Sequence, residues 1–260
     1  MQRIEPVPMS DFRHEDMRIA YFDVGPRDGF PVLLIHGFAS TAHVNWVFTG
    51  WVRTLTDAGY RVIALDNRGH GDSDKPHDPG LYTPQNMAGD ARALLAHLDI
   101  ESAFVKGYSM GARLGAFFAL DRPDAARTLV FGGLGAGLTD GVGDWERIAD
   151  ALLAPSLDDV ADRRGRMFRA FAEQTNSDRR ALAACIESSR TLMAHDDLRR
   201  LDLPALVAVG TRDDIAGCPE ELAEKLPMGR ALHIEDRDHM LAVGDRSFKA
   251  GVLTFFEEHL

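Results

Sequence analysis

The motif Gly107-Tyr108-Ser109-Met110-Gly111 constrains the fold of this chain more than any other segment. It follows a short apolar run, residues 102–105, and opens a segment of helical periodicity, residues 112–120. A serine between two glycines at a strand-to-helix turn forms a nucleophile elbow. The turn is too tight for neighbouring β-carbons, and its strained backbone presents the serine hydroxyl to the surroundings. The motif therefore predicts a strand, a sharp turn and a helix, with Ser109 as a candidate nucleophile.

The composition is typical of a globular protein and argues against two classes of partner. With 260 residues, 45% of them hydrophobic, the chain can bury a sizeable core. A net charge of −11 disfavours binding to nucleic acid or to an anionic membrane, because both need clustered Lys and Arg. No apolar run approaches the roughly 18 residues of a membrane helix, and residues 1–8 lack the apolar core of a signal peptide. We therefore expect a cytoplasmic protein.

Nothing in the sequence indicates a metal or a cofactor. Cys185 and Cys218 are too few for a disulfide framework and lie outside metal-ligand spacing, so we expect free thiols. The ten histidines include no His-x-x-x-His pair in a helical setting. The glycine-rich residues 132–137 lack the strand-turn-helix unit and the later acidic residue of a dinucleotide site. We expect a chemistry that needs no cofactor.

Strand-like and helix-like runs alternate along most of the chain. Period-two alternation predicts an antiparallel strand over residues 17–24, with residues 10–15 as its hairpin partner. Continuous apolar runs predict strands buried on both faces at residues 31–35, 61–65, 103–105, 128–131, 205–209 and 231–234. Helical patterns separate them at residues 46–58, 83–97, 110–120, 219–226 and 247–259. The alternation predicts a mainly parallel sheet of about eight strands with helices on both faces.

Residues 144–201 interrupt this alternation between the sixth and seventh strands. They show no strand pattern, and amphipathic runs such as residues 145–153 and 180–193 predict three or four helices. We therefore divide the chain into a core domain, residues 1–143 and 202–260, and a helical insertion, residues 144–201. Beside the catalytic edge of a sheet such an insertion would act as a lid. The alternative is that these helices simply pad the sheet.

A serine hydroxyl needs a base to take its proton, and the base needs an orienting acid. In this kind of sheet both are expected after later strands at the carboxyl edge, in the order serine, acid, histidine. Asp213 directly follows the strand over residues 205–209, and His239 follows the next strand. Asp214 competes with Asp213 for the role of the acid, and Asp140 is a more distant alternative.

Taken in order, these motifs resemble those of the α/β-hydrolase fold superfamily, and within it the serine esterase, lipase and haloperoxidase-like group. The resemblance extends from about Met17 to His259. Its motifs are His36-Gly37-Phe38, Asp66-Asn67-Arg68-Gly69-His70-Gly71-Asp72-Ser73, the Ser109 elbow, Gly210-Thr211-Arg212-Asp213, and His239. It implies the α/β-hydrolase fold, with the helical insertion as a lid.

The resemblance also implies a role for each motif residue. Ser109 corresponds to the nucleophile, His239 to the general base and later acid, and Asp213 to the carboxylate that orients the histidine. The backbone N–H groups of Phe38 and Met110 correspond to the oxyanion hole, whose donors stay in place before charge develops.

Other residues near these motifs have weaker assignments. We expect Tyr108, Trp46, Phe168 and Phe171 to contact the substrate, although each is also of a type that packs in cores. His36 and His70 are expected to stabilise loops rather than to transfer protons. The family usually has glycine immediately before its histidine; Asp238, which occupies that position here, is expected to be a solvated loop residue.

These assignments predict a carboxylic ester hydrolase that acts through an acyl-enzyme on small to medium aliphatic or aromatic esters, as a monomer or homodimer. A serine nucleophile argues against haloalkane dehalogenases and epoxide hydrolases, which use a carboxylate. A hydrolase of C–C bonds in ring-cleavage products would use the same three residues. A non-catalytic ligand-binding protein that retains the fold is a further alternative, which the complete set Ser109, Asp213 and His239 disfavours.

Overall fold

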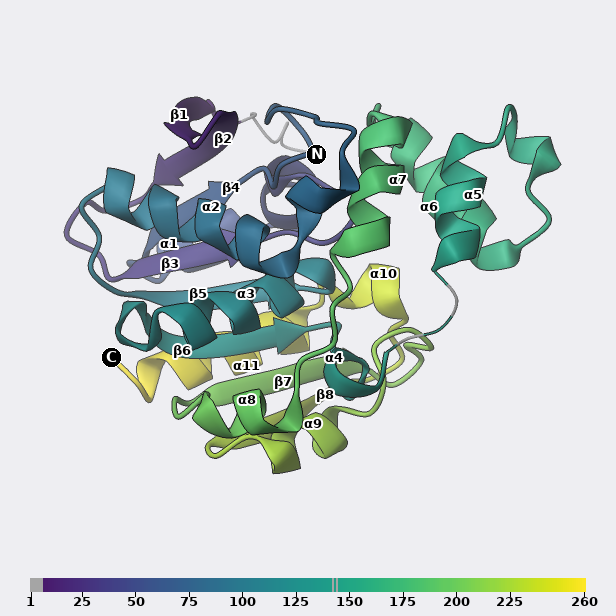
Figure 1. The fold of residues 1–260 in the computed structure, drawn as a ribbon. Coiled ribbons are helices and arrows are strands. Elements are labelled where there is room, and N and C mark those ends of the chain that lie inside the picture. Colours follow the sequence, from purple (N-terminus) through teal and green to yellow (C-terminus); the bar gives the residue numbers. More distant parts are fainter. Residues whose placement is uncertain (1–6, 142, 144) are drawn as a thin grey trace, which may run out of the picture.

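An eight-stranded sheet runs through the centre of the protein (Figure 1). The structure is a computed structural model that describes residues 7–141, 143 and 145–260. Residues 1–6, 142 and 144 lie outside the described residues. Two sequence predictions concern them: the absence of a signal peptide at residues 1–8 and the start of the insertion at residue 144. The strand order is β1-β2-β4-β3-β5-β6-β7-β8.

The sheet is antiparallel at one side and parallel elsewhere. Its strands are β1 (Ser10–His14), β2 (Met17–Val24), β3 (Pro31–Ile35), β4 (Arg61–Leu65), β5 (Ala103–Tyr108), β6 (Ala126–Gly132), β7 (Ala205–Gly210) and β8 (Gly229–Ile234). β1 pairs with β2, and β2 with β4, in antiparallel fashion, whereas all pairs from β4 to β8 are parallel. The predicted mainly parallel sheet of about eight strands is confirmed. Its continuous apolar strands are those that helices cover on both faces.

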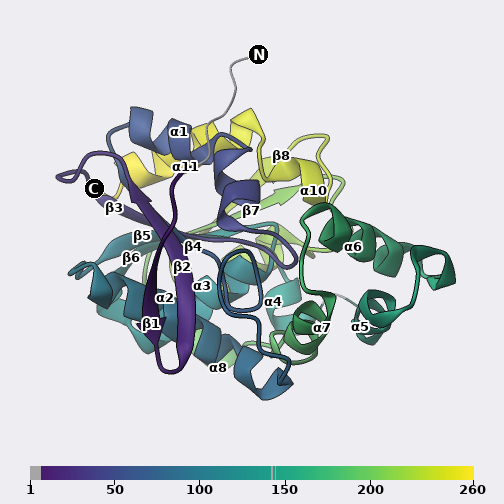
Figure 2. The same ribbon diagram turned by 90° about the horizontal axis from the view of Figure 1, so that it is seen from above.

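Helices cover both faces of this sheet (Figure 2). Two hydrophobic clusters, one on each face, hold them against it. Helices α2 (Pro84–His97), α3 (Met110–Asp121) and α9 (Pro219–Lys225) contribute to one cluster. Helices α1 (Trp51–Asp57) and α11 (Arg246–Glu257) contribute to the other. Successive strand residues alternate between the clusters; on β3, Leu33 belongs to the first and Leu34 to the second. The core is therefore divided by the sheet into two layers.

The single helix predicted over residues 46–58 is wrong. A π-helix, His43–Val47, and α1 occupy this stretch instead, separated by Gly50 in the left-handed conformation (φ +81°). Glycine adopts this conformation without steric cost, so it allows the chain to turn between the two helices. The predicted start of α2 is confirmed, because the Thr83 hydroxyl accepts a hydrogen bond from the Asn86 N–H group at 3.2 Å.

Helices occupy the stretch that interrupts the strand pattern. They are α5 (Glu146–Leu153), α6 (Arg163–Gln174), α7 (Arg179–Ser188) and α8 (His195–Arg200), preceded by α4 (Gly137–Asp140). We call α5, α6 and α7 the insertion helices; they project beyond the carboxyl ends of the parallel strands, whereas α8 lies against the sheet near α9 (Figure 1). Within the described part of the chain, no helix is both long and apolar enough to cross a membrane.

Candidate active site

Ser109 lies at the sharp turn between β5 and α3. Its backbone has φ 53° and ψ −115°, a strained combination for a residue with a side chain. A β-carbon on Gly107 would lie 2.2 Å from the carbonyl oxygen of Gly111, and one on Gly111 would lie 1.9 Å from that of Ile35. Both distances are far below van der Waals contact, so both glycines are required for this turn.

Ser109, His239 and Asp213 are connected by two hydrogen bonds. Ser109 Oγ lies 3.0 Å from His239 Nε2, and His239 Nδ1 lies 2.8 Å from Asp213 Oδ2. Because a carboxylate only accepts hydrogen bonds, Nδ1 donates to it and Nε2 is left to accept from the serine hydroxyl. The side chain of Asp213 is fully buried, and that of His239 is 7% exposed. This arrangement can remove the serine proton.

The other two candidate acids lie elsewhere. Asp214 is exposed, and its main-chain carbonyl accepts a hydrogen bond from Arg164. Asp140, the last residue of α4, forms an ion pair with Lys225 at 3.6 Å. The backbone N–H groups of two residues after Asp213 donate to its Oδ1 at 2.8 and 3.0 Å, which holds the carboxylate over its own turn. Of the three acids, Asp213 is the one that contacts the histidine among the described residues.

Asp238 and Tyr108 fix the backbone around His239. Asp238 accepts hydrogen bonds from the N–H groups of Met240 and Leu241 and so caps the short helix α10 (His239–Ala242), a role that the sequence analysis missed. The Tyr108 hydroxyl donates to the carbonyl oxygen of His239 at 2.5 Å. Burial, assisted by nearby carboxylates, raises the pKa of Tyr108 well above its usual range, so the hydroxyl remains a donor. Both residues position the histidine.

The loop after β3 lies directly against the serine. A β-carbon on Gly37 would lie 3.5 Å from Ser109 Cβ, and the Gly37 N–H group donates to Asn45 Oδ1 at 2.8 Å. Phe38 from this loop and Met110 from the start of α3 line the same cavity as Ser109. The structure thus brings together the two residues whose N–H groups were expected to form the oxyanion hole.

Two buried histidines hold this loop. His36 Nε2 accepts from the Asn67 N–H group at 2.9 Å, and its Nδ1 donates to the Gly37 carbonyl at 2.8 Å. His70 Nε2 accepts from the N–H group of Ala39 (φ +58°) at 3.1 Å. Burial lowers the pKa of His36 to about 4 and that of His70 to about 3, so both rings are neutral and accept at Nε2. The geometry agrees with the structural roles expected for them.

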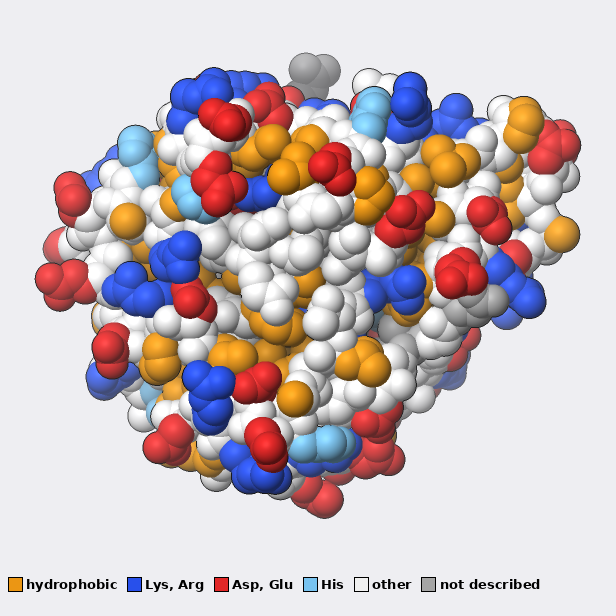
Figure 3. Space-filling model, in the orientation of Figure 1, with side chains coloured by type: hydrophobic (Ala, Val, Ile, Leu, Met, Phe, Trp, Pro, Cys, Tyr) orange, Lys and Arg blue, Asp and Glu red, His pale blue; other side chains and the backbone are white. Residues whose placement is uncertain are grey.

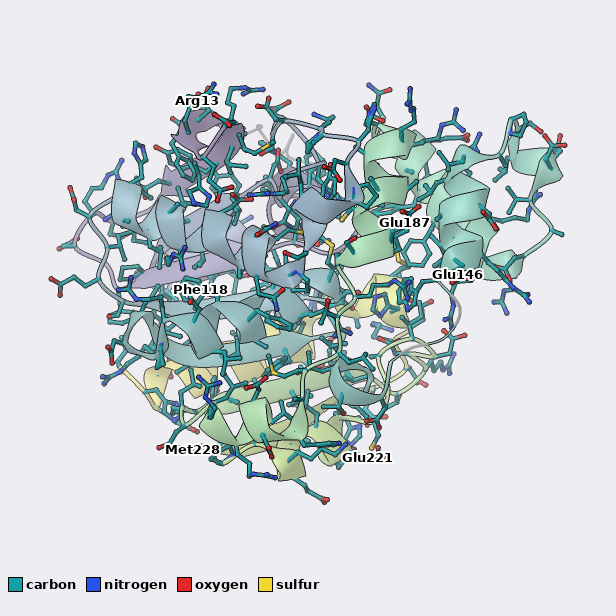
Figure 4. The ribbon with its side chains drawn as sticks, in the orientation of Figure 1. Arg13, Phe118, Glu146, Glu187, Glu221 and Met228 are labelled. Carbon is teal, nitrogen blue, oxygen red and sulfur yellow. The ribbon has the colours of Figure 1, made fainter. Side chains whose placement is uncertain are left out.

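Two cavities meet at Ser109. The first extends under the insertion helices between Met110, Leu134, Trp145 and Ile186. The second extends past His239 and is also lined by Tyr108, Phe171 and Val243. Phe38 and Phe168 line both, with ring centroids 5.7 Å apart in an edge-to-face contact. In Figure 4, Glu146 marks the start of α5 and Glu187 the end of α7, the two helices beside the first cavity.

Trp46 lies away from both cavities. It is completely buried, and its ring packs edge-to-face on Trp51 and over the Lys106 ammonium in the cluster of the α11 face. The structure therefore corrects the prediction that Trp46 contacts the substrate. The π-helix that carries it directs this ring into the core, which a pattern read as one amphipathic helix could not indicate.

Three polar residues of the first cavity were missed by the sequence analysis: Arg113, Ser189 and Arg190. Arg113 is one helical turn after Ser109 and interrupts an otherwise apolar helix. This charged residue in an apolar helix was the signal in the sequence that could have identified Arg113 as a cavity residue. Ser189 and Arg190 follow α7 and carry no distinguishing pattern.

The part of the chain that the structure describes contains no group of three or more His, Cys, Asp and Glu side chains that could hold a metal ion. Cys185 is a buried free thiol, and burial raises its pKa to about 12; Cys218 is a partly exposed free thiol. Neither is linked to Ser109 by a hydrogen bond among the described residues.

The family model described as alpha/beta hydrolase fold matches residues 31–154. A Mycobacterium tuberculosis protein assigned as a non-heme bromoperoxidase is 30% identical over 251 residues, which are 86% of this chain and 91% of that protein. Epoxide hydrolase 2 of Siraitia grosvenorii is 36% identical over 130 residues, half of this chain but 39% of the relative, so the match spans well under half of that protein.

Solved structures agree along almost the whole chain. The crystal structure of a hydrolase from Pseudomonas aeruginosa superposes with a TM-score of 0.80 at 26% identity and covers 95% of this chain and 98% of the other. The structure of an esterase from a Rhodococcus species has a TM-score of 0.74 at 26% identity, with 97% and 99% covered.

Proposed function

This chain belongs to the alpha/beta hydrolase fold family, and from that premise we propose that it is a serine hydrolase of carboxylic esters. The observation that carries the proposal is the chain of hydrogen bonds from Asp213 through His239 to Ser109, at the junction of two cavities. A hydroxyl with a base at 3.0 Å and an oriented imidazole is a group prepared to attack an electrophilic carbon.

The reaction proceeds in two halves. Ser109 Oγ attacks the ester carbonyl while His239 Nε2 takes the hydroxyl proton, and the resulting oxyanion accepts hydrogen bonds from the N–H groups of Phe38 and Met110. The C–O bond to the alcohol then breaks, and His239 gives the proton to the departing oxygen. Water enters, loses a proton to His239 and attacks the acyl carbon; the bond from this carbon to Ser109 Oγ then breaks, His239 returns the proton to Oγ, and the acid leaves.

The walls of the cavities support small to medium aliphatic or aromatic esters. Phe38, Met110 and Phe168 surround the serine with apolar surface, and Phe171 extends it in the second cavity. The two cavities give room for two groups, one on each side of the scissile bond. We propose the insertion helices as the lid, because the hydroxyl of Thr175, directly after α6, lies 3.1 Å from the Ala39 carbonyl oxygen in the loop after β3.

The names of the relatives allow other reactions, and the nucleophile helps to choose among them. Epoxide hydrolases and haloalkane dehalogenases attack through a carboxylate and form an alkyl ester on the enzyme, whereas this chain has Ser109 at the elbow. C–C bond hydrolysis uses the same three residues and is the main alternative. A cytoplasmic location and a monomeric or homodimeric state stay predictions.

A series of 4-nitrophenyl esters from acetate to decanoate tests the proposal, with the wild type and Ser109→Ala compared in parallel. We expect the wild type to prefer the short to medium members, and Ser109→Ala to lower kcat by roughly 10⁴–10⁶-fold. Circular dichroism of the variant checks that it is folded. Ester turnover that survives in Ser109→Ala contradicts the mechanism. If the wild type cleaves no ester but hydrolyses a vinylogous diketone acid, the C–C bond reaction takes its place.

A further inference from the structure

One end of the first cavity is cationic. Arg113 and Arg190 line it together with the buried hydroxyl of Ser189, and the remaining lining between them and Ser109 is mainly apolar. Among the described residues, this lining includes no Asp or Glu. Acidic and basic side chains are interspersed over the face shown in Figure 3, and the whole chain has a net charge of −11. The charged side chains in this described part of the lining are therefore both cationic.

Arg113 is a buried guanidinium held by neutral groups. It is 5% exposed, and its Nη1 donates to the carbonyls of Leu138 and Thr191 at 3.1 and 2.9 Å. Its Nη2 donates to the carbonyl of Gly137 at 2.9 Å. A guanidinium has five N–H donors, so two remain after these three hydrogen bonds. Within the described residues, no carboxylate forms an ion pair with Arg113. A carboxylate with two oxygens is the partner that two remaining donors fit best.

Burial destabilises the positive charge of Arg113. Burial, with a smaller effect of the neighbouring Arg190, lowers its pKa to about 10. The side chain is still cationic at neutral pH. A buried charge that is compensated only by carbonyl dipoles has unfavourable desolvation, which an anion entering the cavity would offset.

Two of the contacts of Arg190 hold it at the cavity wall. Its Nε donates to the Ile186 carbonyl at 2.6 Å, and its guanidinium lies 5.5 Å from the centre of the Trp145 ring. Both Ile186 and Trp145 line the same cavity. The positive charge of Arg190 is therefore fixed in direction rather than free to extend into solvent.

Ser189 is an independent sign of a polar ligand at this end. It is 1% exposed and lines the cavity, and its hydroxyl has no hydrogen-bond partner at normal distance among the described residues. Its hydrogen-bonding neighbour is the thiol of Cys185, which is a weak partner. A polar ligand would complete the hydrogen bonding of this buried hydroxyl.

We propose that Arg113, Arg190 and Ser189 bind a carboxylate of the substrate, so that the preferred ester carries a carboxylate separated from the scissile carbonyl by an apolar segment. Met110, Leu134 and Phe168 line the cavity as the walls for that segment. This inference depends on the proposed ester hydrolysis and names its substrate class. The carboxylate can belong to the acyl part, as in a dicarboxylic acid monoester, or to the alcohol part.

Two matched pairs of esters distinguish these sources. The acyl pair is 4-nitrophenyl hexanoate and the mono-4-nitrophenyl ester of adipic acid, which have the same chain length. The alcohol pair is phenyl acetate and 4-carboxyphenyl acetate. A hydrogen bond to a charged group contributes enough to expect a roughly tenfold to hundredfold higher kcat/KM for the acidic member of one pair. The pair that shows the preference identifies the part that enters the cavity.

Variants then connect the preference to the residues. In Arg190→Gln and Ser189→Ala the ratio of acidic to neutral kcat/KM is expected to fall toward one, with the larger fall for Arg190→Gln. The matched control is Arg180→Gln, an exposed arginine on α7, the helix that Ser189 and Arg190 follow, and it should keep the ratio of the wild type. Arg113→Gln is a less useful test, because this side chain also holds three carbonyls and its loss can unfold the protein.

Binding gives a readout that does not require turnover. Calorimetric titration of folded Ser109→Ala with hexanoate and with hexanamide, its neutral counterpart of the same chain length, should show at least tenfold tighter binding of hexanoate, and Arg190→Gln in the same background should remove that difference. Equal rates for both members of both pairs, or equal binding of the two ligands, overturn the carboxylate site while ester hydrolysis stands. No turnover of any ester overturns the proposed function, and the titration then decides the carboxylate site alone.

Discussion

The elbow of Ser109 and the insertion helices meet at the same cavity, but they contribute to it in different ways. The elbow is determined by backbone contacts so close that a β-carbon would lie 1.9 to 2.2 Å from a carbonyl oxygen. The insertion helices instead contribute side chains, among them Trp145 and Phe168, that other side chains could replace. The difference teaches that the turn at Ser109 depends on backbone contacts within the core, whereas the cavity beside it is lined by side chains from both the core and the insertion.

The largest expected effect comes from adding one methyl group at the elbow. Gly111→Ala would place a β-carbon 1.9 Å from the Ile35 carbonyl oxygen, so we expect a loss of more than about 4 kcal/mol of unfolding free energy or failure to fold. Urea denaturation measures it. Gly89→Ala is the control, because a β-carbon in this helix would lie 3.4 Å from its nearest neighbour, His14. If both variants are equally stable, the elbow is not as constrained as described.

The next prediction separates two adjacent acids. Asp213→Asn keeps the size of the side chain but no longer orients His239 as a carboxylate does, so kcat should fall by roughly 10³–10⁴-fold. Asp214→Asn removes the same charge one residue later, and because Asp214 is exposed we expect a change of less than about threefold. Steady-state kinetics on one 4-nitrophenyl ester measures both. Similar losses in the two variants would contradict the assignment of the orienting acid.

The third prediction concerns pH. The folded pKa of His36, about 4, lies below its ordinary value of 6.5, so between these values the unfolded chain binds the proton and the folded one does not. Stability is therefore complete above about pH 6.5 and falls as the pH falls, by about 1.4 kcal/mol per pH unit for each such histidine. For His36 the total is on the order of 3 kcal/mol, and His70 adds to it down to about pH 3.

Urea denaturation at a series of pH values measures this slope. His36→Asn and His70→Asn should each be less stable than the wild type at neutral pH and should each reduce the slope between about pH 6.5 and 5. In that range most carboxylates remain ionised, so they add little. A free energy of unfolding that does not change with pH over this range would show that the stability of the loop after β3 does not depend on neutral histidines.

The smallest expected effect lies in the insertion helices. Phe168→Leu keeps an apolar wall but opens the contact with Phe38, so we expect kcat/KM for each ester to change by a few-fold and the preferred chain length to shift. The 4-nitrophenyl series measures it. Leu153→Ala, at an exposed position of α5, is the control and should leave the preference unchanged. A loss as large as that of Asp213→Asn would remove the distinction between the two regions.

Much of the fold followed from local patterns. Every predicted strand is present, although β5 and β6 extend beyond their apolar runs, because β-structure continues where polar or glycine residues still pair with a neighbour. The helix over residues 46–58 failed at Gly50, since a single residue with positive φ leaves little trace in hydrophobic periodicity. The strand-to-helix turn at Ser109 was predictable because its glycines are local in the sequence.

The site was predictable only in part. Ser109 and His239 could be chosen from chain order, but Asp213 and Asp214 follow the same strand and differ only in how the turn directs each side chain. Trp46 and Phe168 are both aromatic residues in helical patterns, and only packing showed that the first enters the core and the second the cavity.

By itself, the sequence determined the α/β architecture and the strand-to-helix turn that carries Ser109. These depend on neighbours within a few residues, whose spacing sets the backbone. Tertiary structure decided which carboxylate faces His239, which aromatic rings reach the cavity, and that Arg113 and Arg190 lie at one end of it. Those relations join residues far apart in the chain, and the physical reason is that packing and burial, rather than local spacing, determine which side chains meet.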